Sequence, residues 1–311
     1  LHSFPTRRSS DLGNYLAMNI AYLRRSQIDI EKWDSCIEQS DSLLVYAQSW
    51  YLDIVSPQWS GLVGDNYQAV MPLPTKTKYG IPYFYQPPFT QQLGLFDTSK
   101  VHNDSIIDEF IRKIPFRPYR LHINGYHCPQ RNGIEQPNYT LYLGRKYDDI
   151  SSRFDTNTLR NINKAHKSGV IVERYDSASV ENSDITDKFI EFYLSTPKPY
   201  EVPDNDVFTK LIRETHLRGR MIFYFAYIDG VPIAALALLW SGKRMIYLCP
   251  ISNEYGKQHS AMFLIVNQII IDYQDTDTTL DFEGSRIEGI ARFYRGFGAK
   301  LEPYFLIRRF I

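Results

Sequence analysis

The sequence is poor in cysteine, carries no excess charge and contains no long apolar run. Its three cysteines, Cys36, Cys128 and Cys249, are odd in number and are not spaced like metal ligands. This favours free thiols in a reducing compartment and gives no indication of a metal site. Lysine plus arginine equals aspartate plus glutamate at 35 each, so no global basic field attracts nucleic acid or an anionic membrane. No run approaches the roughly 20 apolar residues of a membrane-spanning helix. These absences predict a cytoplasmic protein without a membrane span.

What the sequence does contain is typical of a globular protein with one large or two ordinary domains. Of its 311 residues, 43% are apolar and 23 are tyrosines, a composition compatible with sheets and a well-filled core. Residues 1–12 differ in composition from the chain that follows and lack the hydrophobic centre of a signal peptide. We interpret them as a non-native leader and exclude them from the fold prediction.

Near the C-terminus, the pattern predicts a strand, a helix and a second strand in close succession. Thr278–Phe282 is β-branched and aromatic and is typical of a strand, and Lys300–Ile307 is predicted as the next strand. Between them, Ser285 and Glu288 form a capping-box pattern at a helix start. One face of this helix should carry four apolar or aromatic residues: Ile287, Ile290, Ala291 and Tyr294. Gly296 and Gly298 are suited to ending the helix.

Three apolar strands are predicted upstream of this unit. Met221–Ile228 and Val231–Trp240 flank Asp229-Gly230, a strong hairpin signal, and Met245–Leu248 follows another turn. The next segment passes through Gly256, Lys257, His259 and Ser260 into an apolar helix at Met262–Tyr273. A strand, a loop and a helix in this order can bind an anion through unpaired backbone N–H groups at the helix start.

The amino-acid sequences of these segments resemble those of the GNAT-fold acyltransferases. Tyr294, four residues before Gly298 in a helix that follows a strand, resembles the tyrosine of their last helix. Asp281-Phe282-Glu283-Gly284 and Phe293–Gly298 resemble the FemAB branch more specifically, and so does the basic stretch Thr158–Val170. The resemblance implies an α/β (α+β) fold of two tandem GNAT-like domains, each with a mixed, mostly antiparallel sheet covered by helices. We place them at residues 13–144 and 145–311.

The same resemblance implies roles for individual residues. Tyr294 would protonate the leaving thiolate, and Glu283 or Asp281 would accept the proton of the attacking amine. The backbone at Leu248 would polarise the acyl oxygen. The pyrophosphate of coenzyme A would bind at Gly256, Lys257, His259 and Ser260. From the residues alone, Tyr294 is better explained as a core residue and Glu283 by helix capping. The basic helix is explained equally by solvation and by contact with phosphates.

Three functions follow from the resemblance. The first is transfer of an acyl group from acyl-CoA to an amine, with no metal. The second is the FemAB reaction, which uses aminoacyl-tRNA to modify a cell-wall precursor; Fem transferases usually carry a lysine where this chain has Tyr294. The third is ligand binding without catalysis. The acceptor amine, a small molecule or a peptidoglycan precursor, and the oligomeric state stay open.

Overall fold

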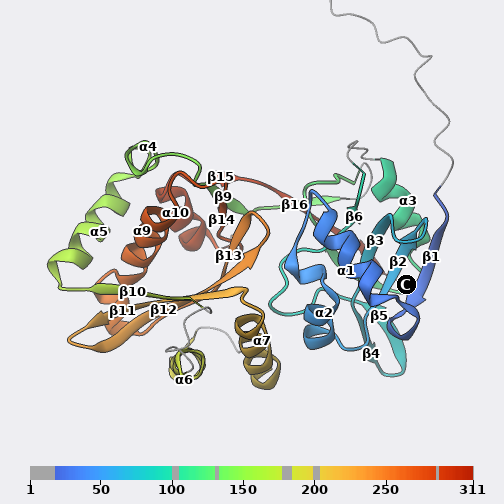
Figure 1. Cartoon of the computed structure of the whole chain (residues 1–311), viewed down its shortest axis with the longest axis horizontal. Coiled ribbons are helices and arrows are strands. Elements are labelled where there is room, and N and C mark those ends of the chain that lie inside the picture. The colour runs from blue at the N-terminus through green and yellow to red at the C-terminus, as the bar shows by residue number, and fades with distance from the viewer. Residues whose placement is uncertain are drawn as a thin grey trace, which may run out of the picture.

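The computed structural model describes residues 18–99, 105–129, 133–176, 184–198, 204–284 and 287–310. They form two lobes that lie side by side (Figure 1). The first lobe holds a four-stranded and a five-stranded sheet, and the second holds a seven-stranded sheet. Within the described part of the chain, no helix is both long enough and apolar enough to cross a bilayer.

The four-stranded sheet of the first lobe has the order β1-β2-β3-β6. A hairpin of β2 and β3 is its centre, with Ser60 opposite Leu73 and Gly64 opposite Ala69. The elements of this half of the lobe are β1 (Ile20–Arg24), η1 (Arg25–Gln27), α1 (Ile30–Gln39), η2 (Val45–Ala47), α2 (Ser49–Val55), β2 (Ser60–Gly64), β3 (Ala69–Leu73), β6 (Phe96–Asp97) and α3 (Ser105–Lys113). Helix α1 begins after Asp29, whose side chain accepts a hydrogen bond from the Lys32 N–H and so caps the helix.

The five-stranded sheet has the order β4-β5-β7-β16-β8. Its members are β4 (Thr75–Lys78), β5 (Ile81–Phe84), β7 (Tyr119–Ile123), β8 (Ile134–Gln136) and β16 (Tyr304–Arg309). Strand β16 comes from the C-terminal end of the chain, which passes from the second lobe into the first (Figure 1). Phe305 and Ile307 of this strand are buried in the core of the first lobe.

The second lobe is built on a sheet of order β10-β11-β12-β13-β14-β9-β15, in which β13 and β14 are parallel. Its strands are β9 (Tyr139–Tyr142), β10 (Ile171–Asp176), β11 (Met221–Ile228), β12 (Val231–Ser241), β13 (Arg244–Ser252), β14 (Thr279–Asp281) and β15 (Lys300–Leu301). Its helices are α4 (Tyr147–Ser151), α5 (Thr156–Lys167), α6 (Ile185–Ser195), α7 (Asn205–Leu217), α8 (Glu254–Gln258), α9 (Ala261–Tyr273) and α10 (Glu288–Gly296). The hairpin at Asp229-Gly230 is confirmed.

Two strands cross between the lobes. Strand β9 precedes the boundary that we predict after residue 144, yet it pairs with β14 and β15 in the second lobe. Strand β16 follows that boundary and pairs with β7 and β8 in the first lobe. The single strand predicted at Lys300–Ile307 is therefore wrong, because the segment divides into β15 and β16 in different sheets. The two crossings tie the lobes together.

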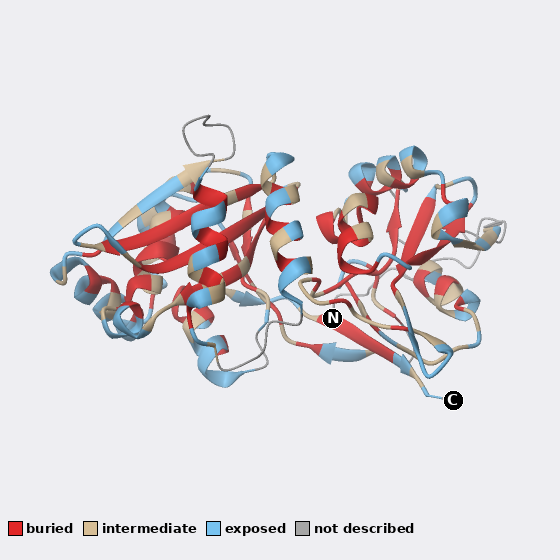
Figure 2. Ribbon diagram, turned by 90° about the horizontal axis from the view of Figure 1, so that it is seen from below, coloured by how far each residue is buried: buried red, intermediate tan, exposed pale blue. Residues whose placement is uncertain are grey.

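Each face of the seven-stranded sheet is covered by its own helices, and the central strands are buried (Figure 2). On one face, α5, α9 and α10 pack over residues such as Tyr224 and Tyr247. On the other, α6 and α7 pack over Phe223 and Phe225, and this core continues into α1 and α2 of the first lobe. The lobes therefore share one hydrophobic core along this face.

Helix α10 begins later than the sequence predicts. Its first residue is Glu288, and Ser285 of the predicted capping box lies outside the described residues. The predicted apolar face is wrong in its first turn, since Ile287 is 63% exposed and Ile290 37% exposed. Only Ala291 and Tyr294 of the four predicted residues are buried. The basic stretch at Thr158–Val170 lies mostly in α5, and a separate short helix, α4, precedes it.

Candidate active site

Strands β13 and β14 part from each other after a short paired stretch. The pairing runs from Arg244 opposite Thr279 to Ile246 opposite Asp281, and β14 ends there. Strand β13 continues to Ser252, paired only with β12 on its other side. The parallel strands therefore open a gap at the carboxyl end of β14.

A bulge in β13 lies at the start of this gap. The register with β12 steps from Tyr247 opposite Leu238 to Cys249 opposite Ala237, so that Leu248 is the extra residue. A bulge leaves its extra residue outside the regular ladder and redirects the neighbouring side chains. The Leu248 side chain packs toward the core shared by the two lobes. The backbone of Leu248, rather than its side chain, is therefore the part that could act at the gap. The resemblance predicts that this backbone polarises the acyl oxygen.

A cavity of about 350 Å³ lies beside the gap. Its walls come from β13, from α8 and the start of α9, and from α10. The lining residues are Tyr247, Pro250, Ser252, Gly256, Lys257, Ser260, Ala261, Met262, Phe263, Gly289, Ile290, Phe293 and Tyr294. Four of the predicted site residues therefore meet here, namely Gly256, Lys257, Ser260 and Tyr294. Its volume lies at the lower end of the range for ligand pockets.

Tyr294 is both a core residue and a wall of this cavity. Its side chain is 5% exposed, and its ring is stacked on that of Phe282 with centroids 4.6 Å apart. The ring of Tyr247 meets it edge-on at 5.9 Å. These contacts fix the direction of the ring. The phenol is therefore held rigidly at the cavity, an arrangement that suits a proton donor.

The N-terminus of α9 opens toward the same cavity. Ser260 precedes the helix in a left-handed conformation, with φ +57°. Its hydroxyl donates to Asn161 Oδ1 of α5 at 2.8 Å, so it does not cap the helix. The N–H groups of Ala261 and Met262 belong to the first turn, where a helix has no internal acceptors. Both residues line the cavity, at the positive end of the helix dipole, which favours an anion.

The other predicted phosphate ligands use their backbone donors within the protein. The Gly256 N–H donates to Asn253 Oδ1 at 2.8 Å, and that of Lys257 to the Asn253 carbonyl at 3.0 Å. A Cβ on Gly256 would lie 2.1 Å from the Ile233 carbonyl oxygen, so close packing of α8 on β12 requires glycine here. His259 lies outside the cavity lining, with its ring 4.3 Å from that of Tyr255.

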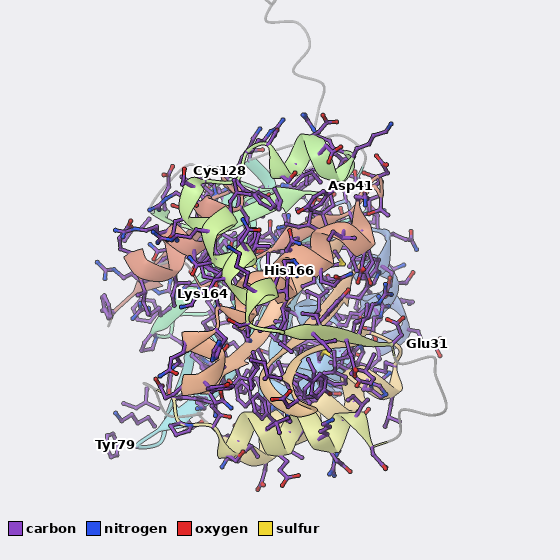
Figure 3. All side chains as sticks on the ribbon, turned by 90° about the vertical axis from the view of Figure 1, so that its left-hand side faces the viewer. Glu31, Asp41, Tyr79, Cys128, Lys164 and His166 are labelled. Atoms are coloured by element: carbon purple, nitrogen blue, oxygen red, sulfur yellow. The ribbon has the colours of Figure 1, made fainter. Side chains whose placement is uncertain are left out.

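The basic residues of α5 do not face this cavity. Lys164 and His166 lie on the outer surface of the second lobe (Figure 3). The helix packs inward through Thr158, Ile162 and Ala165. Its contribution to the cavity is the amide of Asn161, which holds Ser260. The exposed basic face is compatible both with solvation and with contact to phosphates, the two alternatives that the sequence left open.

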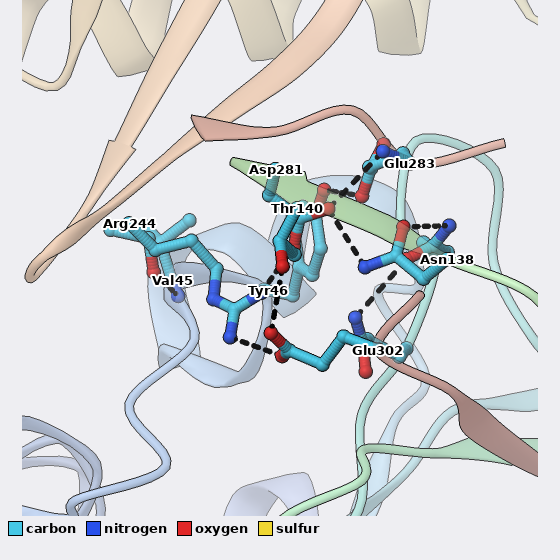
Figure 4. Close-up of polar contacts among 11 residues, drawn as sticks. Val45, Tyr46, Asn138, Thr140, Arg244, Asp281, Glu283 and Glu302 are labelled. Carbon is cyan, nitrogen blue, oxygen red and sulfur yellow. Dashed lines mark hydrogen bonds and ion pairs between the residues drawn. The ribbon is translucent and has the colours of Figure 1, made fainter. Parts of the chain in front are cut away.

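Asp281 is the centre of a polar network behind the gap (Figure 4). Its side chain is 2% exposed, and Arg244 Nη1 of β13 lies 2.7 Å from Oδ2. Oδ1 accepts hydrogen bonds from Asn138 at 2.8 Å and from the Glu283 N–H at 3.1 Å. Arg244 also binds Glu302 at 2.6 Å. Because both oxygens are engaged, Asp281 has the contacts of a structural ion pair rather than those of a base.

Glu283 has a different environment. It follows β14 at the edge of the gap with φ +50°, a conformation that is strained for a glutamate. Burial and the nearby Asp281 raise the pKa of its carboxyl from 4.5 to about 8, while a hydrogen bond from Tyr46 and the charge of Arg244 oppose this rise. A carboxyl with a pKa near neutrality is suited to accept a proton from an amine.

The raised pKa of Glu283 predicts a pH-dependent stability. The folded chain keeps this proton up to about pH 8, whereas an unfolded glutamate releases it near 4.5. The free energy of unfolding should therefore fall between these pH values, by at most about 1.4 kcal/mol per pH unit. Glu283→Gln removes this pH-dependent contribution to the free energy of unfolding. The stability of the variant relative to wild type should therefore increase from pH 5 to pH 8. Urea unfolding of both proteins at several pH values measures this change. If the difference in free energy of unfolding between variant and wild type is the same at every pH, Glu283 does not have a raised pKa.

One residue of this site was not found from the sequence. Tyr46 of η2, in the first lobe, donates a hydrogen bond from its hydroxyl to Glu283 Oε1. The two residues are 237 positions apart. The sequence signal at Tyr46 is only that of an apolar helical face, so no local pattern could have linked it to Glu283. Among the described residues, no group of three or more His, Cys, Asp or Glu is arranged to hold a metal ion.

Comparisons with known proteins concern the fold and the domain that contains this site. Residues 152–289 match the family model described as an acetyltransferase (GNAT) domain. The fold is similar to the crystal structure of FemX, with a TM-score of 0.63 at 12% identity over 94% of this chain and 98% of FemX. It is also similar to the C-terminal domain of a putative lysylphosphatidylglycerol synthetase from Agrobacterium fabrum (TM-score 0.56, 12% identity, 90% of each chain).

A third similar structure is L-PGS from Bacillus licheniformis, with a TM-score of 0.52 at 9% identity over 90% of this chain and 91% of that one. A search of curated proteins found no match. At such low identities the similarity to solved structures shows the fold alone. The family model shows that residues 152–289, within the second lobe, form a GNAT domain. The domain match identifies residues 152–289 as a GNAT acetyltransferase domain, and the chain as a whole shares the two-lobed fold of FemX.

Proposed function

We propose that the chain transfers an acyl group from acyl-CoA to an amine at the gap between β13 and β14. One observation carries the proposal. The parted strands, the uncapped N-terminus of α9 and the rigid phenol of Tyr294 all meet at one cavity. The parted strands would hold the thioester, and the N-terminus of α9 would bind the pyrophosphate. The phenol of Tyr294 would protonate the leaving sulfur. No single one of these features would indicate acyl transfer.

The reaction then follows from the positions of the residues. The amine nitrogen attacks the thioester carbonyl, so that a C–N bond forms and the C–S bond breaks. Backbone N–H groups at the Leu248 bulge stabilise the oxyanion. Glu283 accepts the proton that the amine loses, and Tyr294 gives a proton to the departing thiolate. Both residues return to their starting protonation states by exchange with water.

Binding of acetyl-CoA tests this proposal without knowledge of the acceptor. A ligand that binds only the folded chain raises the free energy of unfolding by about 2.7 kcal/mol at a concentration 100 times its Kd. We therefore expect acetyl-CoA to raise the melting temperature, and calorimetric titration to give heat. The absence of both effects would remove acyl-CoA as the donor.

Gly289 offers a matched pair of variants for this titration. It lies on the cavity wall in α10, and a Cβ placed there meets no atom within 4 Å. Gly289→Phe should fill the cavity and abolish the stabilisation by acetyl-CoA, whereas Gly289→Ala adds one methyl and should retain it. Equal stabilisation of all three proteins would place the donor elsewhere.

The alternative donor is an aminoacyl-tRNA, which the likeness to FemX keeps under consideration. The acceptor would then be a peptidoglycan precursor, while the acyl-CoA reaction is open to a small-molecule amine as well. Phosphate contacts to tRNA give binding that weakens steeply with salt. A chain that binds neither donor would be a GNAT-fold ligand-binding protein without catalysis.

A further inference from the structure

The contact between Tyr46 and Glu283 joins the two lobes at the proposed site. Tyr46 is 1% exposed, and its hydroxyl donates to the Glu283 carboxylate across the lobe boundary (Figure 4). A buried donor of this kind selects one position of the carboxylate among its rotamers and stabilises the ionised form.

Tyr46 is held in place independently of Glu283. The Val45 N–H before it donates to Ser241 Oγ at the end of β12, at 2.8 Å. The Ala47 carbonyl after it accepts a hydrogen bond from the Trp33 indole at 2.9 Å. The ring of Tyr51 meets its own ring edge-on at 5.3 Å. The hydroxyl is therefore placed by contacts on both lobes, and the crossing strands β9 and β16 keep that placement.

Glu283 also interacts with other groups of neighbouring elements. Asp281 of β14 raises its pKa and Arg244 of β13 lowers it. Cys249 of β13 and Tyr51 of α2 are close enough to interact with the carboxylate, and burial raises the pKa of both. Burial likewise raises the pKa of Tyr46 well above 10, so its hydroxyl stays protonated and acts only as a donor.

We propose that Tyr46 is a positioning residue, supplied by the first lobe, that orients the carboxylate of Glu283 and keeps it available as the base. This inference rests on the proposed function, because it takes Glu283 as the acceptor of the amine proton. It makes the active site a joint product of both lobes rather than a property of the matched GNAT domain alone.

The direct test is a titration of Glu283 by NMR in protein labelled with 13C at glutamate carboxyls. The Glu283 signal is assigned by its loss in Glu283→Gln. Removing the donor withdraws stabilisation from the carboxylate, so Tyr46→Phe should raise the pKa of Glu283 by about one to two units. The matched control is Tyr224→Phe, which removes another buried tyrosine hydroxyl, one that donates to Asp272 of α9 at 2.7 Å. It should leave this titration nearly unchanged.

A second variant covers the case in which Tyr46→Phe does not fold. Replacing Tyr46 by 3-fluorotyrosine retains the ring packing and makes the hydroxyl a stronger donor, so the pKa of Glu283 should move down. Identical Glu283 titrations in wild type and in whichever variants fold would overturn the inference.

Kinetics separates this inference from the proposed function. With acetyl-CoA as donor and glycinamide as probe acceptor, the base must be ionised, so kcat/KM falls on the acid side of its pKa. Tyr46→Phe should move this acid limb to higher pH by the same amount as the NMR titration. A shifted titration without detectable transfer would support the Tyr46–Glu283 coupling and reject the proposed reaction. An unshifted titration with normal transfer would do the reverse.

Discussion

Tyr294→Phe should lower kcat by about 10² to 10⁴, the usual range for loss of a general acid. The substitution removes only the hydroxyl and retains the ring that stacks on Phe282 and meets Tyr247. Donor binding should therefore change little, because the cavity keeps its shape. The measurement is thiol release from acetyl-CoA with a primary amine acceptor, together with circular dichroism and the melting temperature.

A control for this experiment is Tyr224→Phe. Tyr224 of β11 is buried in the same core cluster as Tyr294 but does not line the cavity. Its hydroxyl donates to Asp272 of α9 at 2.7 Å. It should lose some stability while retaining turnover. If Tyr294→Phe also retains turnover, its phenol is only a core residue and the leaving thiolate needs no acid from this chain.

Arg244→Met should lower the free energy of unfolding by about 3–5 kcal/mol, the usual effect of removing one partner of a buried ion pair. Burial lowers the pKa of Arg244, but the charges of Asp281 and Glu302 outweigh this and raise it. Without the guanidinium, Asp281 is left as a buried carboxylate with only neutral donors. Urea unfolding measures the change. The ion pair also joins β13 to the last residue of β14, where the two strands part. Its loss should therefore make the positions of the two strands at the gap less fixed.

Two further variants test this explanation. Arg213→Met removes an ion pair to Asp187 whose side chains are 57% and 67% exposed, so its effect should stay below about 1 kcal/mol. Adding Asp281→Asn to Arg244→Met removes the stranded charge and should recover much of the loss. A cost below 1 kcal/mol for Arg244→Met alone would show that the network contributes little to the stability of the fold.

The local patterns of the chain predicted most elements of the second lobe. The Asp229-Gly230 hairpin, the apolar helix α9 and the basic helix α5 lie where periodicity and turn residues place them. The resemblance carried by Phe293–Gly298 directed attention to Tyr294, which lines the cavity. Predictions at the start of α10 were less successful. Ile287 and Ile290 are apolar but exposed, since a helix that begins at Glu288 sets its own inward face.

The phosphate ligands show a second limit. The sequence indicates a glycine-containing loop before an apolar helix, yet it does not say which N–H groups the loop uses for itself. Asn253 takes the N–H of Gly256, and the donors that remain for a phosphate lie at Ala261 and Met262. This difference depends on a left-handed Ser260 whose side chain is held by Asn161, almost 100 residues earlier in the sequence.

By itself, the sequence determined most elements of the second lobe, its Asp229-Gly230 hairpin and the GNAT character of residues 152–289. Only the tertiary structure decided that β9 and β16 change lobes, that Arg244 neutralises Asp281, and that Tyr46 meets Glu283. The physical reason is the distance along the sequence over which each kind of interaction acts. Periodicity and turn chemistry act over a few residues, whereas the charge, burial and orientation of a site are set by groups that only folding brings together.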